Sequence, residues 1–96
     1  ADSKIVRIPY DKILFIEALA DYIIIQTEHK KNIVHFTMKG ISDRLPSDEF
    51  VRIHRSYIVN LDKVESLEDS SLVIGDKYIQ IGASYKEALL DRLNFL

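Results

Sequence analysis

The apolar residues of this chain come in short runs rich in isoleucine and valine, and this pattern limits the fold more than any other feature. Isoleucine and valine supply 20 of the 96 residues, and their branched Cβ atoms favour strands over helices. No uninterrupted apolar stretch is longer than the four residues 22–25, whereas a membrane-spanning helix needs about 18. The runs therefore predict a mainly β fold with strands joined in hairpins.

The strand runs and their connections can be placed along the chain. Strands are expected at residues 5–8, 13–19, 22–28, 33–36, 50–53, 57–61, 64–67, 72–74 and 77–81. The strand at residues 22–28 begins with four consecutive apolar positions, so we expect it to be covered on both faces. Gly75 and Asp76 form a glycine-led connection of two residues, which predicts a tight hairpin with a type II′ turn.

Two short helices complete the expected fold. Thr37 is the expected N-cap of the first, which ends before Pro46 and contains Gly40. Ser84 and Glu87 match a capping box at the start of a C-terminal helix. The apolar stripe expected on that helix consists of Leu89, Leu90, Leu93 and Leu96.

Composition bounds the domain count and the class of protein. The length fits one domain over residues 1–96, and an apolar content of 47% with a net charge of −2 excludes intrinsic disorder. The first residue is Ala1 rather than methionine, so we expect a C-terminal fragment of a longer protein. No basic-plus-apolar signal pattern opens the chain, and a cytoplasmic location is expected. The net charge points to no nucleic-acid partner.

Enzymatic and metal sites are not expected. The chain has no cysteine, which excludes disulfides, thiolate metal sites and cysteine nucleophiles. His29, His35 and His54 fit no metal-ligand spacing, and the three glycines are too scattered for a phosphate-binding loop. We therefore predict no catalytic residues, no cofactor and no small-molecule substrate.

The distribution of charge is more informative than its total. Residues 50–61 contain no acidic residue, but they contain Arg52, His54 and Arg55. Apolar neighbours on both sides are expected to be buried and to force the segment from His54 through Ser56 to Tyr57 outward. A cation, an imidazole, a hydroxyl and a phenol on a rigid base can read phosphates and base edges. The alternative is a solvated turn, with Arg52 in a surface ion pair.

Two further segments are candidates for binding anions or bases. Ser84, Tyr85 and Lys86 stand at the start of the last helix, where free backbone N–H groups attract phosphate; capping alone also explains Ser84, and Tyr85 could belong to the core. Asp21 and Tyr22 lie in a sharp turn between two strands, so Asp21 is expected to face solvent. Asp21 could accept from a cytosine amino group or be a plain turn residue.

The order of these features resembles one known family. Residues 13–18, the pair Asp21-Tyr22 and residues 37–39 look like the opening of a LytTR domain, residues 50–60 (FVRIHRSYIVN) resemble its most diagnostic stretch, and residues 81–86 (IGASYK) are similar to its closing segment. The likeness covers nearly the whole chain in order. It implies a fold of small antiparallel sheets with short helices and a role as the DNA-binding output domain of bacterial response regulators in two-component systems.

The resemblance also implies partners and site residues. Family members insert loops into successive major grooves and bind paired direct repeats near promoters as dimers, often behind a receiver domain. By position, Asp21-Tyr22 matches one DNA-facing loop, Arg55 the middle contact and Lys86 the closing contact. Ser84 and Tyr85 match phosphate contacts, and Lys39 matches a basic position near the DNA backbone. Asp21 stands where some members carry His or Asn, and Ala83 where a basic residue is often found.

Two other functions remain open from the residues alone. A β-rich chain could bind a protein or peptide through an open sheet edge without touching DNA. A membrane-tethered sensor could use the same output domain, if an N-terminal region outside this sequence supplied the anchor.

Overall fold

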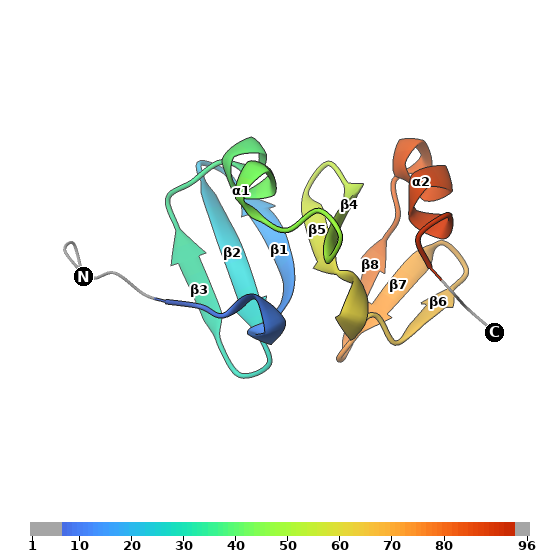
Figure 1. Ribbon diagram of the computed structural model, residues 1–96, viewed down its shortest axis with the longest axis horizontal. Coiled ribbons are helices and arrows are strands. Elements are labelled where there is room, and N and C mark those ends of the chain that lie inside the picture. Colours follow the sequence, from blue (N-terminus) through green and yellow to red (C-terminus); the bar gives the residue numbers. More distant parts are fainter. Residues whose placement is uncertain (1–6, 94–96) are drawn as a thin grey trace.

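Two antiparallel sheets form the framework of the chain (Figure 1), as described for residues 7–93 of a computed structural model. The first sheet has five strands in the order β3-β2-β1-β5-β4, and the second has three in the order β6-β7-β8. The strands are β1 Ile13–Leu19, β2 Tyr22–Thr27, β3 Lys31–Val34, β4 Phe50–His54, β5 Tyr57–Asn60, β6 Ser66–Glu68, β7 Ser71–Ile74 and β8 Lys77–Gln80. The predicted mainly β class is confirmed.

The helices within residues 7–93 are short. They are α1 (Met38–Arg44) and α2 (Lys86–Leu90), with single 3₁₀ turns at Tyr10–Lys12, Leu61–Lys63 and Ala83–Tyr85. Thr37 is the N-cap of α1, as predicted, because its hydroxyl accepts the backbone N–H of Gly40 at 2.9 Å. In this described part of the chain, no helix is long and apolar enough to cross a membrane.

The five-stranded sheet buries side chains on both of its faces, so the molecule has two cores. Neighbouring strand residues point to opposite faces, and Phe15 and Ile16 accordingly belong to different cores. The first core lies between this sheet, the second sheet and α2, and it contains Phe15, Ile53, Val59, Leu72, Ile74, Ile79, Ile81 and Leu89. The second core lies against α1 and contains Ile13, Ile16, Ile23, Ile25, Leu45, Phe50 and Ile58.

Three hairpins close with two-residue turns of one kind. In each turn only the first residue has a positive φ: 52° at Ala20, 57° at Asp69 and 58° at Gly75. A positive φ at the first turn position alone is the type II′ pattern, which agrees with the turn predicted at Gly75. Glycine suits this position, whereas Ala20 adopts it despite its Cβ.

The early strands depart from prediction in coverage and register. β2 is not covered on both faces, because Ile23 and Ile25 are buried while Tyr22 remains 46% exposed. β3 begins at Lys31 and not at Ile33, since Thr27 N–H donates to the carbonyl of Lys30 at 2.9 Å and closes the loop early.

Two other predicted strands are displaced or missing. Arg7 and Ile8 are not in a strand, and the first two residues of the strand expected at 5–8 lie outside the described residues. The strand expected at 64–67 begins at Ser66, because the 3₁₀ turn Leu61–Lys63 takes up the preceding chain and the N–H of Val64 donates back to Leu61.

The C-terminal helix differs most from its prediction. A 3₁₀ turn occupies the positions expected for the first turn of α2, and neither element has a side-chain capping bond. The capping box of Ser84 and Glu87 is therefore wrong. Leu89 is fully buried but Leu90 is 42% exposed, because the short helix offers only one residue to the core. Leu96 lies outside the described residues.

Candidate nucleic-acid interface

Three connections lie along one long edge of the molecule: the β1–β2 turn, the β4–β5 turn and residues 82–86, which end at the first residue of α2 (Figure 1, upper edge). Backbone hydrogen bonds join them. The N–H of Ala18, near the end of β1, donates to the carbonyl of Ser56 at 2.9 Å, and the N–H of Gly82 donates to the carbonyl of Ile53 at 2.7 Å. The segments that the sequence singled out are thus brought to one edge, which we call the turn edge.

The β4–β5 turn exposes Arg55 but not all of its neighbours. Arg55 is exposed, as expected, whereas His54, Ser56 and Tyr57 are half-buried. The prediction that residues 54–57 all point outward is therefore wrong. The Tyr57 ring packs edge-on against Phe15 and His54, with centroids 6.1 and 5.9 Å away, and this contact holds His54 and Tyr57 against the first core.

Two side chains of β4 also form hydrogen bonds with the backbone of the β4–β5 turn. The Nε–H of Arg52 donates to the carbonyl of His54 at 3.2 Å, and an Nη of the same guanidinium donates to the carbonyl of Arg55. The N–H of Ser56 donates to Nδ1 of His54 at 3.1 Å. Among residues 7–93, Arg52 has no acidic partner within ion-pair distance, so the surface ion pair considered for it is not found.

An acidic side chain from another strand reaches the turn edge. Glu17 of β1 faces Tyr57 across the sheet and accepts its phenol O–H at 2.9 Å. Lys77 of β8 lies 3.8 Å from Glu17 and 5.6 Å from the centres of the Tyr57 and Phe15 rings. Burial raises the pKa of Tyr57 to about 12, and the hydrogen bond and negative charge of Glu17 add to the shift.

Sequence reasoning missed Glu17 and Lys77. They meet Tyr57 through strand pairing and sheet packing across long sequence separations, which no local pattern records. One signal was present, because Glu17 is the charged residue in the otherwise apolar strand Ile13–Leu19. A carboxylate there requires a partner if the strand is buried.

The β1–β2 turn presents Asp21 and Tyr22. Asp21 is exposed, as predicted. Tyr22 begins β2, and its ring lies 5.0 Å from the ring of His35, measured between centroids. The turn therefore offers one carboxylate beside two flat rings.

The segment that leads into α2 presents Ser84, and the first residue of α2 is Lys86. Both are exposed, while Tyr85 is half-buried with its ring against Gly82, where an added Cβ would lie 3.0 Å from Cδ2. The N–H of Tyr85 donates to the carbonyl of Gly82, and α2 has only five residues. The expected row of free N–H groups at a helix start is therefore not formed by Tyr85, and the candidate groups here are side chains.

Lys39 lies in the first turn of α1, which sits at the same edge in Figure 1. Its ammonium group is 3.2 Å from Asp43, one helical turn later, and both side chains are exposed. Exposed pairs of this kind are worth little, so Lys39 can exchange Asp43 for another anion.

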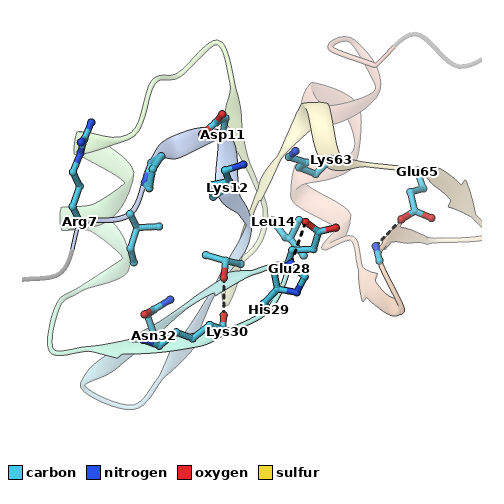
Figure 2. Close-up of a pocket in the computed structure, with 14 residues that line it drawn as sticks. Arg7, Asp11, Lys12, Leu14, Glu28, His29, Lys30, Asn32, Lys63 and Glu65 are labelled. Atoms are coloured by element: carbon cyan, nitrogen blue, oxygen red, sulfur yellow. Dashed lines mark hydrogen bonds and ion pairs between the residues drawn. The ribbon is translucent and has the colours of Figure 1, made fainter.

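Two grooves lie among the described residues, and Tyr22 is the one predicted contact residue that lines either of them. One, of about 590 Å³, is at the opposite ends of the strands, between the β2–β3 loop and the Gly75 turn. Figure 2 shows Lys12, Lys30 and Lys63 around Leu14, with Glu65 bonded to the Gly75 N–H at 2.9 Å. None of the predicted contact residues lines this groove. The predicted contact residues therefore do not form a site in this groove.

A second groove, of about 1070 Å³, opens between α1 and the strands β2 and β3, and its lining includes Tyr22. Within residues 7–93, no three His, Cys, Asp or Glu side chains lie close enough together to hold a metal ion.

Comparison with known proteins identifies the family. The LytTr DNA-binding domain family matches residues 3–94. The transcriptional regulatory protein YpdB from Escherichia coli (strain K12) and that from Shigella flexneri are each 28% identical over 67 residues, which cover 70% of this chain but 28% of the relative. A solved LytTr DNA-binding domain from Bacillus cereus superposes with a TM-score of 0.82 at 23% identity, over 94% of this chain and 88% of that one. The chain belongs to the LytTr DNA-binding domain family.

Proposed function

We propose that the chain binds double-stranded DNA sequence-specifically through the turn edge, and that it serves as the output domain of a bacterial response regulator controlling transcription. One observation carries the proposal: backbone hydrogen bonds fix three connections on a single edge, and Arg55 and Lys86 are exposed there. Fixed loops place cations at defined points, which a chain with a net charge of −2 needs in order to bind a polyanion.

The size of the edge suits successive grooves of DNA. The molecule is 45 Å long and 22–24 Å across, and the turn edge runs parallel to the long axis in Figure 1. The major groove returns to the same side of B-DNA about every 34 Å along the helix axis. Connections spread along the edge can therefore enter grooves one helical turn apart.

The side chains divide by exposure into different roles. Arg55 is the candidate for reading a base, because an arginine can donate two hydrogen bonds to guanine. Lys86, Ser84 and Lys39 are candidates for phosphate. Asp21 and Tyr22 supply the third contact. The half-buried members of the predicted site, Arg52, His54, Ser56, Tyr57 and Tyr85, shape the edge from within.

We propose that two copies of the chain bind each DNA site together. Two copies on paired direct repeats, held together by an upstream receiver or other domain, would gain affinity through effective concentration. The curated relatives support a longer protein, since the matched segment covers 28% of their length. A cytoplasmic location and the lack of a catalytic step follow from the same proposal.

Substitution of Arg55 tests the proposal. The preferred duplex is first selected from a random-sequence pool with the domain fused to a dimeriser. Arg55→Ala should then cost roughly 1–3 kcal/mol on that duplex and relax preference at one base pair. Arg7→Ala is the matched control, because Arg7 is exposed beside the groove at the opposite end and should bind as the wild type does.

Three results can follow. An equal loss on every sequence would make Arg55 a phosphate contact and not a base reader. No loss at all would contradict the proposed edge. Binding of a peptide with no affinity for any duplex would favour the interaction module instead.

A further inference from the structure

The Arg52 guanidinium holds two consecutive carbonyl groups of the β4–β5 turn. Its Nε–H donates to the carbonyl of His54 at 3.2 Å and an Nη donates to that of Arg55. Arg52 and His54 are separated by an irregularity in the β4–β5 pairing, where the register shifts. The residue at the irregularity is Ile53, whose carbonyl accepts the N–H of Gly82 at 2.7 Å, and the Arg52 guanidinium extends past Ile53 to the two carbonyls of the turn.

The imidazole of His54 completes the same structure from the other side. Its Nδ1 accepts the N–H of Ser56 at 3.1 Å, an i to i+2 bond like the one an Asn forms in an Asx turn. Two side chains therefore bond to the backbone on either side of Arg55, while Arg55 itself is exposed.

We infer that Arg52 and His54 are positioning residues that fix the turn presenting Arg55, and that they act on DNA through Arg55 without touching it. The inference rests on the proposed function and deepens it. A hydrogen bond from Arg55 to a base requires the side chain to point in a defined direction. Loss of the Arg52 or the His54 hydrogen bonds to the turn should therefore weaken binding to the preferred sequence, whereas binding to mixed sequence depends mainly on charge.

Arg52→Lys separates positioning from charge. Lysine keeps the positive charge, but its ammonium group lacks the planar fork that donates in two fixed directions. We expect Arg52→Lys to weaken binding to the selected duplex roughly tenfold or more, the size of a lost directional base contact. Binding to a mixed-sequence duplex should stay within about twofold, with the same salt slope. Arg7→Lys is the matched control and should change neither.

A double-mutant cycle with Arg55 supplies the decisive readout. If Arg52 acts through Arg55, Arg52→Lys should cost less than about twofold in an Arg55→Ala background. The same loss in both backgrounds would mean that Arg52 contacts DNA itself, and it would overturn the inference. Full binding of the selected duplex by Arg52→Lys would overturn it as well.

His54 variants keep the inference testable if Arg52→Lys lowers the melting temperature below the assay range. Asn can accept the Ser56 N–H in an Asx turn, so His54→Asn should retain binding within about twofold. Phe keeps an aromatic ring against Tyr57 but offers no acceptor, so His54→Phe should lose roughly tenfold on the selected duplex and little on mixed sequence. Equal behaviour of the two variants would overturn the role of His54.

The outcomes distinguish this inference from the function on which it rests. If the wild-type domain binds no duplex, the proposed function fails and the inference falls with it. If the wild type binds and the cycle shows no coupling between Arg52 and Arg55, the inference alone fails.

Discussion

Arg55 is exposed in a turn whose neighbouring residues His54, Ser56 and Tyr57 are half-buried, and this contrast defines the site at the scale of single residues. Tyr57 donates to Glu17 at 2.9 Å, and Arg52 and His54 bond to the turn backbone. Glu17 brings a negative charge near the edge, but Lys77 lies 3.8 Å from it. The carboxylate of Glu17 is thus paired with Lys77. It therefore does not offset the positive charge that Arg55 presents at the turn edge.

The phenol of Tyr57 should give the stability of the domain a dependence on alkaline pH. Its pKa is raised from 10.0 to about 12, so the folded state favours the neutral phenol. That contribution is fully present below pH 10 and is lost as the pH rises through 12. We expect a component of the phenolate absorbance near pH 12, accompanied by falling stability in denaturant melts.

Tyr57→Phe should remove both signals and keep the ring contacts. Tyr78→Phe is the control, because that residue is 60% exposed and its hydroxyl bonds to Glu68 on the second sheet. It should retain the component near pH 12. A Tyr57→Phe protein that still showed the component would assign the raised pKa to the wrong residue.

Ala20 should be a point of backbone strain. Its φ of 52° lies in the left-handed region, which costs an L-residue roughly 1–2 kcal/mol, and glycine avoids that cost. We expect Ala20→Gly to stabilise the domain by about 0.5–1 kcal/mol in urea melts. Ala18→Gly, in the extended part of β1, should instead destabilise it by a similar amount. A loss of stability in Ala20→Gly would contradict the strained turn.

Exposure of single residues could be predicted better than their contacts. Asp21, Arg55 and Lys86 are exposed where turn chemistry and the closing segment placed them. The inward positions of His54 and Tyr57 were not predicted, because they depend on partners such as Glu17 that lie far away in the sequence. Local patterns record neither strand pairing nor the atoms it brings together.

At the scale of elements, α1 illustrates how a cap can outweigh helix propensity. A Cβ at Gly40 would lie 2.9 Å from the Thr37 hydroxyl and 3.0 Å from the Phe36 ring. The glycine that weakens the helix pattern therefore leaves room for the cap that starts the helix. A glycine stands at position 40 because Thr37 and Phe36 pack closely there at the start of the helix, and not because the chain makes a turn.

Gly40→Ala should consequently fail to give the usual gain. In an open helix the change would stabilise by about 1 kcal/mol, but here we expect a loss of up to about 1 kcal/mol through the disturbed cap. Ser42→Ala is the matched control, since Ser42 is exposed in the same helix, and it should gain roughly 0.5 kcal/mol. Denaturant melts that show Gly40→Ala above the wild type would contradict this account.

Strand positions were predictable where apolar patterns ended in clear turns. β1 matches its predicted bounds and β2 is one residue short. β3 moved because hydrogen bonds within the loop set its register, and loop geometry is not visible in hydrophobicity. The capping box failed because the chain forms a 3₁₀ turn before α2, with Tyr85 against Gly82.

At the scale of the whole molecule, the arrangement of the two sheets creates the turn edge. The order β3-β2-β1-β5-β4 puts β1 beside β5, so the β1–β2 and β4–β5 turns are neighbours. The bond from Gly82 to Ile53 adds the third connection. The class of fold could be predicted from composition and runs, but this strand order could not, since several orders bury the same residues.

The global charge of −2 then acquires a definite meaning. A protein with this net charge does not bind DNA through attraction of its whole surface. A few cations at defined positions must contact the DNA instead. This role falls to three exposed basic groups along the turn edge, Arg55, Lys86 and Lys39, and the number of phosphates they neutralise can be measured from the salt dependence of affinity.

Titration of a mixed-sequence duplex over a range of salt concentrations tests the central claim most directly. For three neutralised phosphates, log K should fall against log salt with a slope of about −2.7, and Lys86→Ala should reduce the slope to about −1.8. Lys12→Ala, beside the groove at the opposite end, should leave it unchanged. No binding at low salt up to about 100 μM duplex would contradict DNA binding by this edge.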